Sequence, residues 1–270
     1  MTSALGVVER SAGAPVASHD ATPPAIRING VSKAYGHSGN AVVALDRLTL
    51  DVAPGEFVCL VGASGCGKST LLNIVAGLDS PTQGSVEVTL GRPALMFQES
   101  ALFPWLGVRR NIELALRLSK VPRNERRSRA DALLEMVHLG GFGDKKPHEL
   151  SGGMRQRGAL ARALAQRASV LLMDEPFGAL DAMTRDILHD ELDRLWRENG
   201  LSVLFVTHNV REAVRLGDRV VLLSSRPGRV VAEFDVDIDR PRRIDSSEIA
   251  NAAATITDRL RAEVRRHADD

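Results

Sequence analysis

Residues 62–70 read Gly-Ala-Ser-Gly-Cys-Gly-Lys-Ser-Thr, and this stretch decides the fold. It matches the phosphate-binding pattern G-x-x-x-x-G-K-[ST] without a mismatch. An apolar, strand-like run (Phe57–Val61) comes before it, and a helix-like run (Ser69–Ala76) comes after it. The alternative is a glycine-rich turn that carries a surface lysine. The strand before the turn and the helix after it favour a loop that holds a phosphate chain.

The residue types of this loop suit a phosphate ligand. Several backbone N–H groups have to turn toward the phosphates, and Gly62, Gly65 and Gly67 let the backbone approach without a clash. The positive end of the next helix lies on the same anion. Lys68 can reach the β- and γ-phosphates, and the Ser69 hydroxyl can bind Mg²⁺. We expect nucleotide contacts from the whole loop: Gly62, Ala63, Ser64, Gly65, Cys66, Gly67, Lys68, Ser69 and Thr70.

The composition argues against several classes of protein. The 270 residues carry 35 basic and 34 acidic side chains, a net charge of +1, which disfavours a general electrostatic nucleic-acid binder. No run of about 18 apolar residues is present, so no segment is expected to span a bilayer. The two cysteines, Cys59 and Cys66, lack metal-binding spacing, and a disulfide between them would distort the phosphate loop. A reducing cytosol is the simplest inference.

The chain reads as one large domain with a short segment at each end. Residues 1–24 are rich in Ala, Ser, Thr, Gly and Pro and are expected to be a disordered leader. The domain is expected over residues 25–245, with a helical segment at about 100–167. A stripe of Ile249, Ala253, Ile256, Leu260 and Val264 predicts a C-terminal helix within residues 246–270. The sequence thus predicts a β-rich N-terminal part, a parallel α/β core and a helical insert.

A second candidate motif is the apolar run Val170–Met173, which ends in Asp174 and Glu175. Parallel sheets bind ligands at the carboxyl ends of their strands, so these carboxylates are expected beside the phosphate loop. Asp174 suits a water-mediated contact to Mg²⁺. Glu175 suits the polarisation of a water in line with the γ-phosphate. The alternative is an acidic strand end that only caps the next turn.

A third motif, Leu150–Met154, opens a predicted helix. Ser151, Gly152 and Gly153 leave bare N–H groups at the positive end of the helix dipole, which makes a second anion cradle. An ordinary helix cap is the alternative. If the helical insert holds this cradle away from Lys68, a second copy of the chain could bring the two together.

Together these motifs resemble those of the ATP-binding cassette subunit of ABC transporters, over roughly residues 26–223. The matches in chain order are Tyr35 as the aromatic residue on adenine, Gly62–Thr70 as Walker A, Gln98 as the Q-loop glutamine, Leu150–Met154 as the signature, Val170–Glu175 as Walker B, Ala179–Asp181 as the D-loop and His208 as the switch histidine. Met154 departs from the common family pattern, which has Gln at that position.

The resemblance implies a fold, a reaction and an assembly. The fold is a P-loop NTPase core with a RecA-like parallel sheet, an N-terminal antiparallel β subdomain and a helical subdomain insert. The reaction is ATP hydrolysis with Mg²⁺, with Lys68, Glu175 and His208 as catalytic residues. Two chains form a head-to-tail homodimer, and each ATP touches Walker A of one copy and Ser151, Gly152 and Gly153 of the other. The remaining contacts implied are Tyr35 and Asp181 to the nucleotide, and Ser69, Gln98 and Asp174 to the metal.

Two of these assignments have simpler alternatives. Tyr35 is a single tyrosine in a turn, where tyrosines usually pack; its place ahead of the phosphate loop favours adenine stacking. His208 could simply end a buried strand, whereas the resemblance makes it hold the γ-phosphate and the attacking water.

The stretch Ala101–Trp105 is apolar and aromatic in a predicted exposed loop, and such patches suggest a docking site. The resemblance implies that two integral-membrane permease subunits dock near Phe103 and Trp105. The subunit would then lie on the cytoplasmic face of the cell membrane, and an extracytoplasmic solute-binding protein would be an indirect partner. The alternative is that both aromatic residues belong to the core of the insert.

Several segments resemble the nitrate, sulfonate and taurine importer group. They are Gln98–Glu99, Leu102–Trp105, Met154, Pro176–Asp181, Arg226–Arg229 and Asp237–Arg243. The resemblance implies uptake of a small anion, with an aliphatic sulfonate or taurine favoured and nitrate next. This is analogy, because the solute does not touch this subunit.

Non-transport ABC ATPases are the other class considered. DNA-repair and chromosome ATPases place a long coiled coil between the two motifs, whereas a short insert separates Lys68 from Ser151. Ribosomal cassette proteins typically carry two cassettes, and one is present here. Glu175 together with His208 disfavours a purely binding role.

Overall fold

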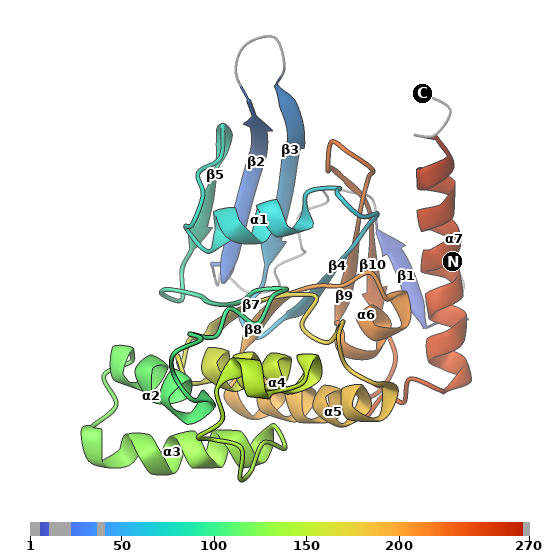
Figure 1. The fold of residues 1–270 in the computed structure, drawn as a ribbon. Helices are drawn as coiled ribbons and strands as arrows, with labels where there is room; N and C mark the ends of the chain where they lie inside the picture. The colour runs from blue at the N-terminus through green and yellow to red at the C-terminus, as the bar shows by residue number, and fades with distance from the viewer. Residues whose placement is uncertain (1–5, 11–22, 37–40, 267–270) are drawn as a thin grey trace.

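The computed structural model describes residues 6–10, 23–36 and 41–266, and these form two sheets and a set of helices (Figure 1). One sheet has seven strands in the order β1-β10-β9-β4-β8-β7-β6. Its strands are β1 (Val7–Arg10), β10 (Val230–Val236), β9 (Arg219–Leu223), β4 (Phe57–Val61), β8 (Ser202–Val206), β7 (Val170–Asp174) and β6 (Ala94–Met96). The other sheet is antiparallel, in the order β3-β2-β5. Its strands are β2 (Ile26–Tyr35), β3 (Val42–Val52) and β5 (Gln83–Val88).

The centre of the large sheet is parallel and buried on both faces. Strand β4 pairs in parallel with β8 and β9, and β7 pairs in parallel with β8 and β6. All five residues of β4 are buried, and alternate side chains belong to different cores. Phe57 and Cys59 face one core, and Val58 and Leu60 face the other. A strand covered on both faces reads as a continuous apolar run.

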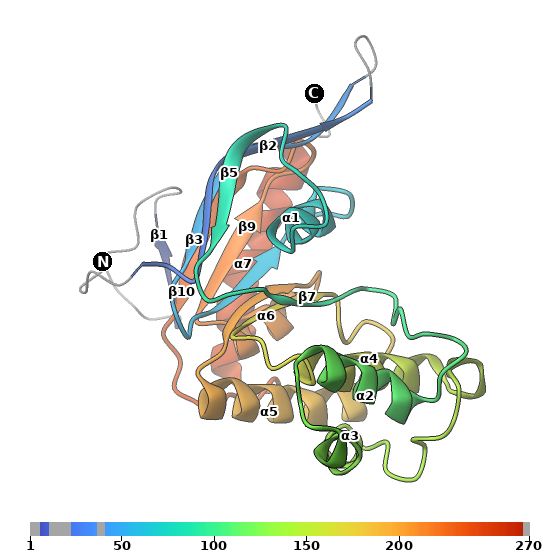
Figure 2. The same cartoon turned by 90° about the vertical axis from the view of Figure 1, so that its left-hand side faces the viewer.

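Some of the helices cover this sheet, and others form a group at one end of it. They are α1 (Lys68–Val75), α2 (Val108–Leu118), α3 (Arg123–Met136), α4 (Gly152–Leu164), α5 (Ala182–Asn199), α6 (Val210–Leu216) and α7 (Ser247–Arg266), with a 3₁₀ turn at Pro147–Glu149. Helix α1 packs against both sheets. Helices α2, α3 and α4 gather away from the three-stranded sheet in both views (Figures 1 and 2). The predicted fold class is confirmed: an α/β P-loop core with an antiparallel β subdomain and a helical insert.

The expectation of a disordered leader over residues 1–24 is wrong for residues 7–10. Val7–Arg10 forms strand β1, which pairs antiparallel with β10 in the register Val7↔Val236. The ion pair Arg10–Asp235 and the contact of Glu9 with Arg259 attach β1 further. The partners lie more than 200 positions away in the sequence, so local composition gave no sign of them. The rest of the predicted leader, residues 1–5 and 11–22, lies outside the described residues.

The C-terminal helix packs along most of its apolar stripe. Ile249, Ala253 and Ile256 are buried and Leu260 is partly buried, but Val264 is exposed. The packed part of the stripe therefore ends at Leu260, before the helix itself ends at Arg266. Among the described residues, no helix combines the length and apolar character that a bilayer crossing requires.

Candidate nucleotide site

Three strand ends meet at one edge of the large sheet. The Glu175 N–H donates to the Val206 carbonyl at 2.9 Å, and the Thr207 N–H donates to the Leu60 carbonyl at 3.2 Å. These bonds align the ends of β4, β7 and β8. The phosphate loop, the two carboxylates after β7 and the histidine after β8 therefore emerge side by side, where a parallel sheet binds its ligand.

The phosphate loop enters helix α1 through a glycine that no other residue could replace without strain. Gly67 caps α1 with φ 99°, and a Cβ there would stand 2.7 Å from the Ala44 carbonyl oxygen. No side chain caps α1, and its first turn carries no acidic residue. The first N–H groups of the helix and its positive dipole end are thus left to face an anion.

Lys68 is the first residue of α1 and is only 7% exposed. Its Nζ donates to the Gly62 carbonyl at 2.8 Å and to the Ala63 carbonyl at 3.0 Å. These bonds fold the side chain back over the loop and keep the ammonium charge within it. The cation is therefore held where the loop N–H groups converge.

A cavity of about 390 Å³ opens above the loop. It brings together most of the predicted nucleotide contacts, including Gln98 from the end of β6 and Glu175 from the end of β7. The residues that line it are Tyr35, Val42, Ala44, Ser64, Gly65, Gly67, Lys68, Ser69, Thr70, Gln98, Glu175 and Arg226. Gly62, Ala63 and Cys66 belong to the loop but do not line the cavity, and the Cys66 side chain is buried beneath it.

Tyr35 forms one wall of this cavity at the end of β2. Its hydroxyl donates to Asp79 Oδ2 at 3.0 Å, and Lys33 Nζ lies 5.0 Å from the ring centroid. Lys33 also forms an ion pair with Asp79 at 2.5 Å. The ring is thus fixed at the cavity mouth and remains partly exposed, as a platform for a base would be.

The residues suited to Mg²⁺ are Ser69, Asp174 and Gln98. Burial raises the pKa of the Asp174 carboxyl, while a hydrogen bond from Ser69 acts in the opposite direction. Among the described residues, no group of three or more His, Cys, Asp or Glu side chains could hold a metal by itself. A cation here would depend on the nucleotide phosphates for further ligands, as is usual for Mg²⁺. The Ser69 hydroxyl and the Asp174 carboxylate fit that donor set.

Glu175 has a strained backbone. It lies in the left-handed region with φ 45°, which is uncommon for a residue with a side chain. Such residues concentrate at sites where geometry serves function. Glu175 Oε2 lies 3.1 Å from His208 Nδ1, and both residues also line a small adjoining cavity of about 40 Å³. The His208 side chain is 68% exposed, in contrast to the buried residues of strand β8 that precede it.

A buried polar network lies behind His208 and was not predicted from the sequence. Glu212 Oε1 lies 2.8 Å from His189 Nε2, and Arg215 Nη1 lies 3.1 Å from His189 Nδ1. Because a guanidinium only donates, Nδ1 accepts and Nε2–H donates to Glu212. The Thr207 hydroxyl donates to Glu212 Oε2 and accepts from the Asn209 N–H at 2.9 Å. Thr207 and Asn209 flank His208, so the network fixes the chain on both sides of it.

The predicted signature residues lie apart from the cavity. Ser151 caps α4, and its Oγ accepts from the Met154 N–H at 3.2 Å. Gly152 and Gly153 face the D-loop: a Cβ on Gly153 would meet Leu180 Cδ2 at 3.0 Å. Ser151, Gly152 and Gly153 are absent from the cavity lining. In both overall views α4 and α1 lie on opposite sides of β7 (Figures 1 and 2).

Asp181 adjoins the signature residues and not the cavity. It caps α5, and its Oδ1 accepts from the Thr184 N–H at 3.0 Å. This N–H lowers the pKa of the Asp181 carboxyl below its ordinary value. The structure thus divides the predicted residues into two groups, one around Lys68 and one around Ser151.

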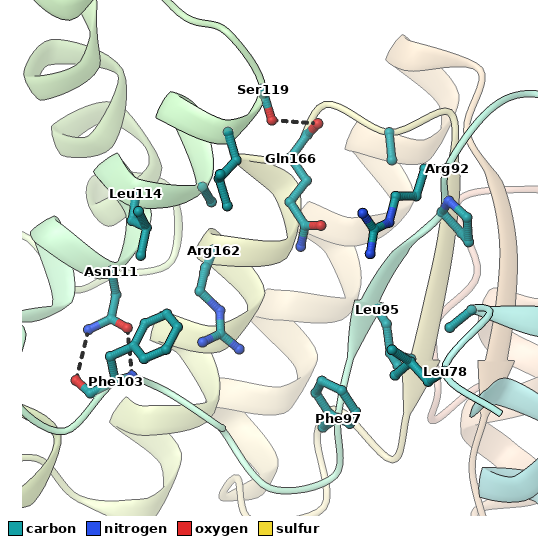
Figure 3. Close-up of a pocket in the computed structure, with 15 residues that line it drawn as sticks. Leu78, Arg92, Leu95, Phe97, Phe103, Asn111, Leu114, Ser119, Arg162 and Gln166 are labelled. Atoms are coloured by element: carbon teal, nitrogen blue, oxygen red, sulfur yellow. Dashed lines mark hydrogen bonds between the residues drawn. The ribbon is translucent and has the colours of Figure 1, made fainter.

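A separate groove of about 520 Å³ separates the helical insert from the core (Figure 3). Phe103 and Leu114 line it from the insert, and Leu78, Leu95 and Phe97 line it from the core. Both walls are therefore largely apolar. Gln98, which lines the nucleotide cavity, directly follows Phe97 in the chain, so the groove and the cavity share one connecting segment.

Buried Asn111 fixes the aromatic loop beside this groove. Its Oδ1 accepts from the Phe103 N–H at 2.8 Å, and its Nδ2 donates to the Leu106 carbonyl at 3.2 Å. Phe103 and Trp105 lie with ring centroids 5.4 Å apart, and Trp105 is 68% exposed. Trp105 is therefore not part of the insert core, which corrects that alternative.

Arg226 is a site residue that the sequence did not predict. It lines the nucleotide cavity, and its Nε donates to the Gly65 carbonyl at 3.2 Å. It lies 161 positions after Gly65, in the loop between β9 and β10. The sequence contained one hint, since Arg226–Arg229 is an Arg-Pro-Gly-Arg turn, but its proximity to the phosphate loop depends on the strand order.

Known proteins are similar to this chain in sequence and in fold. The family described as ABC transporter matches residues 45–178. The taurine import ATP-binding protein of Mesorhizobium japonicum is 50% identical over 212 residues, which cover 76% of this chain and 82% of that protein. The nitrate import ATP-binding protein of Synechocystis is 44% identical over 220 residues, covering 79% and 83%. A solved dimeric ATP-binding cassette, in a post-hydrolysis state with ADP and Pi, is 35% identical with a TM-score of 0.73 and covers 78% of this chain and 98% of that one.

Proposed function

The chain belongs to the ABC transporter family, and on that premise we propose that it is the ATP-binding and ATP-hydrolysing subunit of an import system for a small anion. Relatives that import taurine and nitrate confirm the expected importer group. The observation that carries the proposal is the cavity in which Lys68, Ser69 and Glu175 converge.

The predicted site residues have the following roles under this proposal. The loop N–H groups and Lys68 bind the β- and γ-phosphates, and Tyr35 stacks on adenine. Ser69, Gln98 and Asp174 would hold Mg²⁺, which would neutralise charge on the phosphates. Glu175 accepts a hydrogen bond from the attacking water and draws off its proton. His208, held 3.1 Å from Glu175, orients that carboxylate and the γ-phosphate.

Two chains complete the site. Ser151, Gly152 and Gly153 form a partly exposed helix start outside the cavity of their own chain, so that a partner chain could present them to its phosphates. The similar solved cassette is described as a dimer, which supports this assembly. The proposed dimer is head-to-tail, with two ATP molecules between the subunits.

The experiment that tests the activity is Glu175→Gln. The amide cannot take the proton, so MgATP turnover should fall between about 100- and 10,000-fold while ATP binding persists. The variant should then accumulate as an ATP-bound dimer, measured by size exclusion with light scattering. His208→Gln is a second variant. We expect its ATP turnover to fall as well, while its dimer still binds ATP. Wild-type turnover in Glu175→Gln would refute the assigned role.

The groove beside Phe103 is proposed as the docking site of a short helix from the membrane subunit. Its apolar walls, and an exposed Trp105 beside them, suit an amphipathic helix of the permease. The chain would then act at the cytoplasmic face of the membrane. Trp105→Ser should abolish transport in the reconstituted complex and leave basal ATPase activity of the free chain unchanged. Met183→Ser, on an exposed apolar residue outside the groove, is the control and should leave transport intact.

The solute is the finer part of the proposal. We propose an aliphatic sulfonate or taurine first, and nitrate next, from the resemblance to relatives that import taurine and nitrate. Uptake of labelled taurine by cells with and without the gene, with methanesulfonate, ethanesulfonate and nitrate as competitors, tests it. Equal taurine uptake by cells with and without the gene would exclude taurine as the solute.

A further inference from the structure

Arg226 extends from a loop that the rest of the structure holds rigidly against the phosphate loop. Ser224 Oγ donates to the Pro227 carbonyl at 2.6 Å and accepts from the Arg229 N–H at 2.8 Å. The Gly228 N–H donates to the Ala44 carbonyl at 2.9 Å. The loop is therefore closed on itself and bonded to strand β3.

The loop also touches the back of the phosphate loop. A Cβ on Gly228 would stand 2.2 Å from the Cys66 carbonyl oxygen, so only glycine permits this approach. Two residues earlier, Arg226 Nε donates to the Gly65 carbonyl at 3.2 Å. Its Nη2 lies 3.2 Å from where a Cβ on Gly65 would stand. The guanidinium thus lies next to Gly65, in the space where any other residue would carry its side chain.

Two arginines of this loop differ in their partners. Arg229 is paired with the Asp46 carboxylate, with its Nε 2.8 Å from Oδ2. Among the described residues no carboxylate forms an ion pair with Arg226, whose one hydrogen bond to a carbonyl leaves four N–H groups for other acceptors. Arg226 lines the nucleotide cavity and Arg229 does not. The cation without a counter-ion is the one that faces the cavity.

We propose that Arg226 is a phosphate-binding residue, which contributes a second cation to the nucleotide beside Lys68. This inference rests on the proposed nucleotide site and adds a residue to it. A polyphosphate is the complementary ligand, because a guanidinium pairs with phosphate oxygens through charge-assisted hydrogen bonds. The contact also joins the β9–β10 loop to the nucleotide, so that the antiparallel end of the large sheet takes part in ATP binding.

The test compares Arg226→Gln, Arg226→Lys and the matched control Arg229→Gln in the full chain. Dissociation constants for ATP, ADP and adenosine are measured by isothermal titration calorimetry at low and at high salt. We expect Arg226→Gln to bind ATP and ADP about tenfold more weakly, with part of the loss recovered by Arg226→Lys. The penalty should shrink as salt rises and should be absent for adenosine.

Several outcomes would overturn the inference. They are wild-type affinity in Arg226→Gln, an equal loss in Arg229→Gln, or a penalty for adenosine as large as that for ATP, which would point to base stacking. These results would leave the proposed ATPase function intact. A wild-type chain that binds no ATP would overturn both.

Discussion

The phosphate loop and the signature segment both present a helix N-terminus, yet they are built differently. Helix α1 starts at Gly67 without a side-chain cap, and Lys68, strand ends and Arg226 surround its N-terminus. Helix α4 starts at Ser151, whose own hydroxyl caps it, and its first residues lie outside the cavity. One helix start is enclosed and lined by charge. The other is exposed and has its glycines against the D-loop.

This difference shows what one chain supplies by itself. Parallel strands end at the same edge, so the phosphate-loop half receives Glu175 and His208 from its own sheet. The signature half offers an anion the N–H groups and the dipole of a helix start. We interpret the first as the binding half of an ATP site and the second as the half that closes it from a partner chain.

The largest expected effect is at the phosphate-loop half. Lys68→Ala removes the buried cation of the loop, so ATP affinity should fall on the order of 100-fold, because the phosphates lose the charge-assisted hydrogen bonds proposed for this ammonium. Calorimetry or a fluorescent ATP analogue measures it. Lys145→Ala, on an exposed lysine paired with Glu149, is the control. Unchanged affinity in Lys68→Ala would show that the phosphates bind elsewhere.

The second prediction asks whether the two halves meet across chains. Gly152→Asp places a negative charge at the signature helix start, where a side chain has room because the nearest atoms lie 3.9 Å away. Lys68→Ala and Gly152→Asp should each lack ATPase activity. A mixture of the two variants should show roughly a quarter of the wild-type ATPase activity. With random pairing, half of the dimers contain one of each variant, and each of these has one intact site out of two.

The control for this mixing experiment is Gly152→Ala, whose methyl adds no charge and should remain active. A mixture as inactive as its components would contradict a site shared between chains.

The third prediction concerns the link between the halves. Helix α5 starts at the D-loop and carries His189, which bonds Glu212 behind His208. His189→Leu leaves the Glu212 and Arg215 side chains short of a buried partner, which should lower the unfolding free energy by about 1–3 kcal/mol. Urea denaturation measures the change. His189→Gln should recover most of it, because an amide can donate to Glu212 and accept from Arg215; failure of that rescue would contradict the assigned bond directions.

The smallest expected effect is the pH dependence of stability. It has opposite sign for Asp174, in the phosphate-loop half, and for Asp181, beside the signature. Burial raises the pKa of Asp174, so the folded state binds this proton more tightly than the unfolded state does. Stability from Asp174 is therefore lost as pH rises from its ordinary pKa through the raised one. The Thr184 N–H lowers the pKa of Asp181, so its contribution is present above the ordinary pKa and lost as pH falls through the lowered one.

Carboxyl-carbon NMR titration in Mg²⁺-free protein measures both pKa values. Asp174→Asn and Asp181→Asn should each remove one of the two slopes in stability against pH, and Asn at position 181 still caps the helix. If the pKa values of Asp174 and Asp181 were shifted in the same direction, the contrast between a buried and an exposed half would be contradicted.

Some parts of the site could be predicted because their chemistry is local. The glycines and lysine of residues 62–70 act through one turn and the first residues of one helix, so nine consecutive residues carry the pattern. The same holds for the Ser151 cap, which bonds three positions along the chain. Strand β1 could not be predicted in this way, because only its pairing with β10 makes it a strand.

The sequence by itself determined the phosphate loop, the carboxylates after β7, the order of the motifs and the α/β fold class, since each depends on neighbours within a few residues. Only the tertiary structure decided that Arg226 lies on Gly65, that His189 reaches Glu212 behind His208, and that Ser151 lies apart from the cavity of its own chain. The reason is physical: these contacts join segments that the strand order brings together, and a side chain's neighbours in space are not encoded within its own stretch of sequence.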